Sequence, residues 1–276
     1  MNRLKSLFIS AYLTMLAVGT ARAFWMSFSN PEWGWVILAL LFGLGFFMWV
    51  FLFDVSRTGK ASTVMWLGPV CSIVGLITSN VTDFEIWMWV LDVGLFGSLT
   101  YILWYSRFNR TASDQLAVGQ PLPHMTFDLP DGSALNTKDL PGPLLLMFYR
   151  GNWCPLCMAQ IKEVAQQYQQ LADKGVQLLM ISPQSHKNTA QLAGRFDVPM
   201  TFLIDKDLQE AKRLRIEALN GLPTGLEALG YDSDTVMPTV IITDQNQNII
   251  FCDQTDNYRV RPEPDTFIAV LNQAGI

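Results

Sequence analysis

The sequence is poor in charge, in cysteine and in histidine. Of its 276 residues, 16% are Asp, Glu, Lys or Arg, four are Cys and two are His. So few Cys and His residues exclude a disulfide framework and a metal cluster with several soft ligands. The net charge of −5 offers no basic surface to phosphates, and no Lys/Arg cluster is interleaved with aromatic residues in the second half. We therefore expect no metal, no organic cofactor and no nucleic-acid partner.

The charges that are present are unevenly distributed. They are sparse before about residue 107 and regular after it, while 50% of the whole chain is hydrophobic. This asymmetry predicts two parts in different surroundings. We expect a helical membrane region over residues 1–110 and a globular domain over residues 111–276.

Four apolar stretches follow one another in the first part. Each is close to the roughly 20 residues that cross the hydrocarbon core of a bilayer. Trp and Tyr residues, whose rings suit the headgroup layer, stand near several of their ends. The pattern predicts a bundle of about four transmembrane helices, with the third the shortest, and membrane lipid as a partner. The predicted spans are residues 7–28, 33–53, 62–79 and 86–105.

A cleaved signal peptide is the alternative for the first stretch. Arg3 and Lys5 precede an apolar run, and Ala21–Ala23 resembles a cleavage site rich in small residues. Arg22 lies inside that site and argues against cleavage. We therefore predict an uncleaved anchor.

Basic residues in the short loops predict the orientation, because Lys and Arg are retained on the cytoplasmic side. The loops around residues 29–32 and 80–85 carry acids and no Lys or Arg. Four spans then place both termini and the globular domain on the cytoplasmic side of a bacterial-type inner membrane. If residues 62–79 do not cross, the domain moves to the other face. The basic residues are Arg3, Lys5, Arg57, Lys60, Arg107 and Arg110.

Two charges lie inside the apolar stretches, where an unpaired ion is costly. Arg22 lies near the outer end of the first stretch and Asp92 near the outer start of the fourth. We predict that these two side chains pair and fix the packing of the helices.

From Val118 onward, short β-rich runs alternate with helical periods. This alternation is typical of an α/β fold with a central mixed sheet flanked by helices. Residues 216–236, rich in Gly and polar residues, are expected to form an inserted loop near the active face. The expected strands are 125–129, 143–149, 176–182, 200–204, 238–243 and 248–253, and the expected helices are 154–174, 189–196, 207–215 and 263–274.

A pair of cysteines stands where a strand ends and a helix begins, in the segment Tyr149–Cys157. A thiol at a helix N-terminus faces unpaired N–H groups, which lower its pKa, so we expect Cys154 to be the nucleophile. Cys157 lies one turn deeper on the same face and can resolve the oxidised partner. Pro155 suits the first helical turn. Arg150 is a candidate to stabilise the thiolate, and Trp153 to shape the pocket.

Two alternatives compete with a reactive dithiol. A zinc site would need about two further ligands, and only Cys252, His124 and His186 are available. An inert buried pair is the other alternative, although the strand-to-helix location favours reactivity.

Further along the chain, a strand is expected to open with Met237, Pro238 and Thr239. Pro238 has no N–H and cannot donate a hydrogen bond to the sheet. A plain proline in an edge strand is one explanation of this pattern.

Residues 118–276 resemble the AhpC/TSA-type redoxins, specifically a peroxiredoxin-like branch with a Tyr-Arg-Gly-x-Trp-Cys-Pro-x-Cys motif. The resemblance rests on Phe148–Cys157, on Ile181–Pro183 and on Asp256–Pro264. It implies a thioredoxin fold. It also implies that Met237, Pro238 and Thr239 form a cis-proline loop that lies beside the dithiol and receives the substrate chain.

The sequence departs from true peroxiredoxins in one respect. With Cys154 as the peroxide-reactive residue, their Pro-x-x-x-Thr/Ser-x-x-Cys signature needs Pro at 147 and Thr or Ser at 151. Met147 and Gly151 stand there instead, so the hydroxyl that orients a peroxide is missing.

Three functions fit these observations. The first is dithiol-disulfide exchange, in which Cys154 attacks a protein or small-molecule disulfide, Cys157 resolves it, and an external thiol reductant resets the pair. The second is a thiol peroxidase, in which a hydroperoxide oxidises Cys154 to a sulfenic acid. The third is a membrane scaffold without catalysis.

Overall fold

The computed structural model describes residues 2–59 and 62–276. It divides into two compact units, one built mainly from Arg3–Arg107 and the other from Phe108–Leu222 and Leu226–Ile276. The second unit thus begins three residues before the predicted position 111, because Phe108 N–H donates to the carbonyl of Asp256. Lys60, one of the residues that predict the orientation, lies outside the described residues.

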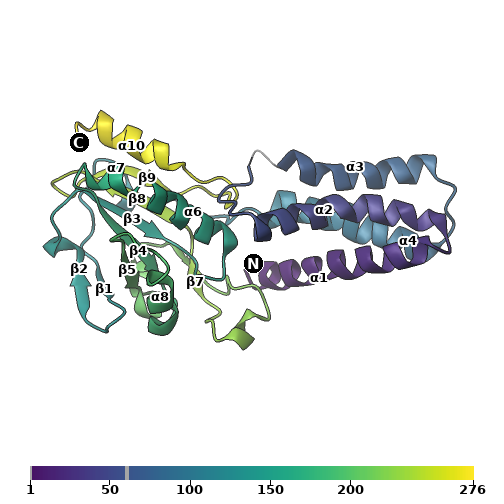
Figure 1. The fold of residues 1–276 in the computed structure, drawn as a ribbon, viewed down its shortest axis with the longest axis horizontal. Helices are drawn as coiled ribbons and strands as arrows, with labels where there is room; N and C mark the ends of the chain where they lie inside the picture. Colours follow the sequence, from purple (N-terminus) through teal and green to yellow (C-terminus); the bar gives the residue numbers. More distant parts are fainter. Residues whose placement is uncertain (1, 60–61) are drawn as a thin grey trace. The chain divides into compact units, whose positions relative to one another are not determined.

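The first unit consists of helices that run side by side (Figure 1). The last of them is continuous from Phe84 to Tyr105 and contains two π-helical stretches. The elements are α1 (Asn2–Ser27), a 3-10 turn (Pro31–Trp33), α2 (Gly34–Leu52), α3 (Ser62–Thr78), α4 (Phe84–Met88), the π-helical Trp89–Gly97, α5 (Ser98–Thr100) and the π-helical Tyr101–Tyr105.

Three of these helices are long and apolar enough to cross a membrane: Asn2–Ser27, Pro31–Leu52 and Phe84–Tyr105. Helix α3 has 17 residues, which gives it a length of about 26 Å, less than the roughly 30 Å of a hydrocarbon core. Three of the four predicted spans therefore have the length expected of a transmembrane helix. The third segment is apolar but short.

Small residues allow the helices of the first unit to approach closely. A Cβ at Gly68 of α3 would lie 2.9 Å from the carbonyl oxygen of Ala39 in α2, and a Cβ at Gly94 would lie 2.7 Å from the Cβ of Ala39. The buried hydroxyls of Tyr12 and Ser98 form a 2.8 Å hydrogen bond. Such contacts are typical of helices that pack in lipid.

The predicted Arg22–Asp92 pair is wrong. Arg22 instead donates from Nε and Nη2 to the two carboxylate oxygens of Glu85, at 2.5 and 2.8 Å. Helix α4 begins at Phe84, so Glu85 lies in its first turn, level with the end of α1. Asp92 lies about 10 Å further along the same helix, which is too far to meet Arg22.

The second unit contains a seven-stranded mixed sheet with the order β2-β1-β5-β4-β3-β8-β9. The three strands β3, β4 and β5 are parallel, whereas β8 is antiparallel to β3 and β9 is antiparallel to β8. The order β4-β3-β8-β9 is the thioredoxin arrangement, which confirms the predicted fold. The strands are β1 (Thr126–Asp128), β2 (Ala134–Asn136), β3 (Leu144–Phe148), β4 (Gln177–Ser182), β5 (Thr201–Ile204), β8 (Thr239–Thr243) and β9 (Ile249–Asp253).

The helices of this unit follow the sequence pattern with two exceptions. The predicted helix 154–174 is interrupted at Gln167, and the predicted helix 207–215 becomes regular only at Gln209, because Asp207 and Leu208 have φ angles of 56° and 55°. The helices are α6 (Pro155–Gln166), α7 (Tyr168–Ala172), α8 (His186–Ala193), α9 (Gln209–Arg213) and α10 (Pro264–Gln273). The short 3-10 turns are Asp114–Leu116, Thr137–Asp139, Lys206–Leu208 and Leu226–Leu229.

The central strand β3 is buried along its whole length and leads directly to the dithiol. Its neighbours β4 and β8 are almost equally buried, so apolar side chains from all three strands form the core. Helix α10 lies beside α7 (Figure 1), where the side chain of Lys174 contacts Asn272. This packing holds the segment before α10 near α6.

Candidate active site

The dithiol lies where β3 passes into α6. Cys154 has extended backbone angles and occupies the position before the first helical residue, Pro155, as predicted. The preceding turn requires glycine, because Gly151 has a φ of 146° and a Cβ there would lie 2.6 Å from Trp153 Nε1. Cys157 lies one helical turn further along.

Both sulfur atoms are buried. Cys154 is 5% exposed and Cys157 is 1% exposed, and both are free cysteines. A hydrogen bond joins the two side chains. Each thiol therefore determines the proton affinity of the other.

A buried arginine contacts the deeper thiol. Nη1 and Nη2 of Arg261 each lie 3.7 Å from Cys157 Sγ. Nη1 also donates to Gln160 Oε1 at 2.9 Å, and Nε donates to the carbonyl of Tyr258 at 3.2 Å. Arg261 is 7% exposed, so its charge acts on Cys157 with little screening by water.

These contacts shift the pKa values of the two thiols in opposite directions. Burial alone would raise the pKa of Cys157, but the hydrogen bond from Cys154, the charge of Arg261 and the backbone N–H of Arg150 lower it to about 5. The hydrogen bond with Cys157, together with burial, raises the pKa of Cys154. These directions are opposite to the expectation that the helix N-terminus gives Cys154 the lower pKa.

Arg150 and Trp153, two of the predicted supporting residues, stack on each other. The guanidinium carbon of Arg150 lies 4.9 Å from the centre of the Trp153 ring, and Nη2 donates to the carbonyl of Gly221. The charge of Arg150 lowers the pKa of Cys157, but less than that of Arg261.

The segment 216–236 covers this end of the sheet, as predicted, but it is not a plain loop. It contains a small hairpin of β6 (Glu217–Ala218) and β7 (Thr235–Val236). Thr235 Oγ1 donates to the carbonyl of Arg150 at 2.7 Å, and Tyr231 OH donates to Asn152 Oδ1 at 2.7 Å. The hairpin thus fixes the turn that precedes Cys154.

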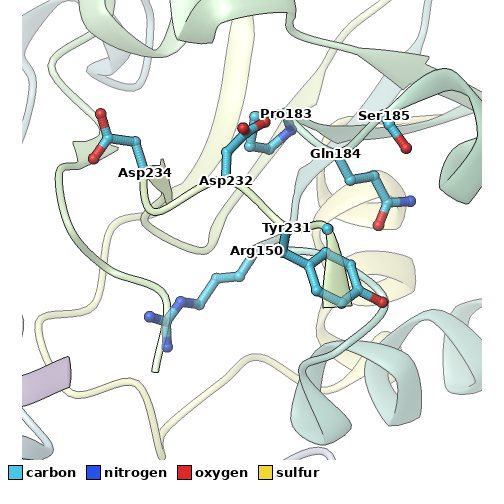
Figure 2. Close-up of a pocket in the computed structure, with 8 residues that line it drawn as sticks. Arg150, Pro183, Gln184, Ser185, Tyr231, Asp232 and Asp234 are labelled. Atoms are coloured by element: carbon cyan, nitrogen blue, oxygen red, sulfur yellow. The ribbon is translucent and has the colours of Figure 1, made fainter. Parts of the chain in front are cut away.

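A small cavity of about 20 Å³ lies beside this turn, roughly the space of one water molecule. Gln184 lines it and also holds the turn, because its Oε1 accepts from the N–H of Asn152 at 2.9 Å and its Nε2 donates to Tyr149 OH at 3.1 Å. Figure 2 shows Gln184 and Tyr231 on the loops around this cavity. The lining residues are Arg150, Pro183, Gln184, Ser185, Gly230, Tyr231, Asp232 and Asp234.

The segment Met237–Thr239 lies beside the end of β3, because Thr239 pairs with Phe148. Its peptide groups are occupied: Met237 N–H donates to the carbonyl of Ile216 at 2.7 Å, and Pro238 C=O accepts from Arg110 Nη1 at 3.0 Å. The Met237–Pro238 bond is trans, so the implied cis-proline loop is wrong. The chain passes here directly from the hairpin strand β7 into β8.

The remaining cysteines and histidines lie elsewhere. Cys252 pairs with Ile241 within the sheet. Burial is the main cause that raises the pKa of the Cys252 thiol to about 12. His186 Nε2 lies 3.7 Å from an oxygen of Asp128. In residues 2–59 and 62–276, no group of three potential metal ligands comes together.

Sequence reasoning did not assign a role to Arg261 or to Gln160. Arg261 belongs to the segment Asp256–Pro264, which carries part of the family resemblance. That resemblance was the feature of the sequence that could have indicated a role for Arg261. Gln160 lies three residues after Cys157, on the same face of α6. Its position as a polar residue on the apolar face of the predicted helix could have indicated a role for Gln160.

The second part of the chain is similar to known proteins. Residues 118–252 match the model of the AhpC/TSA family. This segment is an AhpC/TSA domain.

Two kinds of relatives resemble the AhpC/TSA domain. The protein named "Putative peroxiredoxin bcp" of Coxiella burnetii is 32% identical over 93 residues, which are 33% of this chain and 62% of that protein, less than two thirds of its length. The crystal structure of peroxidoxin BcpB from Mycobacterium tuberculosis is 16% identical, covers 59% of this chain and 98% of its own, and has a TM-score of 0.46. The structure of the thiol peroxidase from Chromobacterium violaceum is 15% identical, covers 60% of this chain and 91% of its own, and has a TM-score of 0.46.

Proposed function

We propose that this protein is a membrane-anchored, thiol-dependent peroxidase that reduces a hydroperoxide at the Cys157–Cys154 dithiol. The observation that carries the proposal is the contact of the Arg261 guanidinium with the buried sulfur of Cys157, which lowers the pKa of that thiol. A low pKa keeps the sulfur ionised at neutral pH, which peroxide reduction requires.

The proposed reaction balances with the two thiols and one external reductant. The Cys157 thiolate attacks one oxygen of the hydroperoxide, an S–O bond forms, the O–O bond breaks, and the released alkoxide takes a proton to give an alcohol. The Cys154 thiol then attacks the sulfenic acid, which yields water and a Cys157–Cys154 disulfide. An external thiol donates two electrons and two protons to restore both thiols.

Two observations favour a small oxidant over a protein disulfide. Cys157 is 1% exposed, so a bulky disulfide has no path to its sulfur. The peptide groups of Met237 and Pro238, which the resemblance assigns to a substrate chain, already bond to Ile216 and Arg110. A hydroperoxide is smaller than a disulfide and needs no free peptide groups to bind a substrate chain.

Dithiol-disulfide exchange is the second candidate. It is favoured by the greater exposure of Cys154, 5% against 1%, and by Gly151, which offers no hydroxyl to orient a peroxide at Cys154. In this reaction Cys154 would pass its proton to Cys157, attack the substrate disulfide, and be released by Cys157. A scaffold without catalysis is disfavoured by an ionised dithiol.

We further propose that the helical unit anchors the protein in a bacterial-type inner membrane, with the dithiol on the cytoplasmic side. Three long apolar helices and the apolar side chains exposed on them, such as Phe24, Phe51 and Ile77, support the anchor. The basic loops support the orientation. Membrane lipid, a hydroperoxide and a thiol reductant are the expected partners.

Stopped-flow kinetics of the reduced full-length protein in detergent tests the proposal. We expect H2O2 to oxidise the wild type far faster than it oxidises free cysteine, with complete loss in Cys157→Ser. In Cys154→Ser the first oxidation should persist, and the product should remain a sulfenic acid. Slow peroxide reaction with fast reduction of a protein disulfide, lost in Cys154→Ser, would establish exchange instead.

A further inference from the structure

Gln160 is a buried amide beside the proposed reaction centre. It lies one turn after Cys157 on α6 and is 3% exposed. Its Oε1 accepts from Arg261 Nη1 at 2.9 Å. Its Nε2 is buried and has no hydrogen-bond partner in the described part of the chain.

The orientation of this amide is fixed by its neighbour. A guanidinium only donates hydrogen bonds, so the oxygen of the amide must face Arg261 and the nitrogen must face away from it. Buried amide nitrogens in native proteins nearly always have an acceptor, and one without a partner is costly. Gln160 therefore holds a buried donor that no acceptor in the described residues satisfies.

Gln160 and the Cys157 sulfur flank the same guanidinium. Nη1 of Arg261 lies 2.9 Å from Gln160 Oε1 and 3.7 Å from Cys157 Sγ. A small molecule that reaches the sulfur therefore comes within the neighbourhood of the amide. An oxygen atom of such a molecule can accept a hydrogen bond from the amide.

We infer that Gln160 is a catalytic residue whose Nε2 donates a hydrogen bond to an oxygen of the hydroperoxide. The inference rests on the proposed peroxidase function and names a group that performs it. Negative charge passes from the Cys157 sulfur to the peroxide oxygens as the S–O bond forms and the O–O bond breaks. A fixed donor stabilises that charge.

Two substitutions distinguish the role of the Gln160 Nε2 donor from the role of Oε1, which accepts from Arg261. In Gln160→Met the new side chain has a similar size but no amide, so it neither donates nor accepts an amide hydrogen bond. Gln160→Glu keeps an acceptor for Arg261 but loses the donor at neutral pH. Both are made in the full-length protein in detergent, together with the wild type.

Two rate constants of Cys157 are measured by rapid quenching and mass spectrometry, one for oxidation by H2O2 and one for alkylation by iodoacetamide. Their ratio removes any change in the fraction of thiolate, because both reactions use the thiolate. We expect the ratio to fall about tenfold or more in both variants, as for the loss of one donor to developing charge. An alkylation rate of Cys157 close to that of the wild type verifies that the surroundings of the dithiol are kept in each variant, because unfolding would expose the buried sulfur and change that rate.

The outcomes are distinguishable. A ratio within about twofold of the wild type in both variants would show that the amide only fills space, and a fall in Gln160→Met alone would show that it only holds Arg261. Either result overturns the inference while the wild type still reduces peroxide. If the wild type itself does not react with H2O2 through Cys157, the proposed function fails and the role of Gln160 fails with it.

Discussion

Arg261 reaches the dithiol from the segment that precedes α10, and both of its terminal nitrogens lie 3.7 Å from Cys157 Sγ. A helix N-terminus favours a negative charge by about 0.3–1 kcal/mol, which is less than one pKa unit. The pKa of Cys157 falls from 9.0 to about 5 despite burial. The direct contacts of Cys157 therefore outweigh the helix N-terminus that favours Cys154.

Replacing Arg261 by Met should raise the pKa of Cys157, because the opposite charge is removed and burial remains. We expect alkylation of wild-type Cys157 by iodoacetamide to have its midpoint near pH 5 and to be constant above about pH 6, since the lowered pKa keeps the thiolate present there. In Arg261→Met the rate at pH 6 should fall about tenfold or more. Arg261→Lys, which keeps the charge, should fall less; equal midpoints in all three proteins would contradict this account.

The residues next to one another in the sequence were predictable, and those brought together by the fold were not. Cys154, Pro155 and Cys157 form a local motif whose position at a strand end and helix start follows from the flanking pattern. Arg261 is 104 residues from Cys157. No periodicity connects positions that far apart, so the location of the thiolate could not be derived.

At the scale of elements, α9 shows how a local backbone conformation limits a predicted helix. Asp207 and Leu208 have positive φ angles before it, and Arg215, with a φ of 57°, follows it. The N–H of Ile216 donates back to the carbonyl of Ala211 at 2.9 Å, which closes the helix end. This is the arrangement in which glycine is preferred at the position of Arg215.

Replacing Arg215 by Gly should stabilise the AhpC/TSA domain, because glycine has no Cβ to strain at this φ. Arg215 is exposed, so little packing is lost. We expect the free energy of unfolding to rise by about 0.5–1 kcal/mol, which thermal unfolding would detect as a higher Tm. Arg215→Ala is the control, since it removes the charge and keeps the Cβ; a similar gain in both variants would mean that the charge, and not the backbone, is responsible.

Element types followed from the hydrophobic pattern, but their interruptions did not. The buried strands β3 and β4 lie within two residues of their predicted bounds. The break at Gln167 and the hairpin of β6 and β7 have no comparable signal, since they depend on contacts such as that of Thr235 with Arg150. The ion pair of Arg22 was assigned to the wrong carboxylate for the same reason, because it depends on where α4 begins.

At the scale of the molecule, charges are sparse in the residues that form the first unit and regular in those that form the second. The first exposes large apolar side chains on long helices, whereas the second buries them beneath a mixed sheet. The number of membrane crossings depends on whether α3, which has 17 residues, is long enough to span the bilayer. An apolar segment of about 26 Å can cross if the bilayer thins locally or if flanking side chains reach the interface.

The location of the dithiol therefore depends on α3. We predict that α3 crosses and that both termini lie in the cytoplasm, because the loop between α2 and α3 and the segment after Tyr105 both carry basic residues, whereas the loop before α4 carries acids. Reporter fusions that are active only outside the cytoplasm, placed after Asn30, after Thr58 and after Ile276, would measure this. Activity only at Asn30 is expected. Activity at both Asn30 and Ile276 would mean that α3 does not cross, and the reductant of the dithiol would then have to act on the outer side of the membrane.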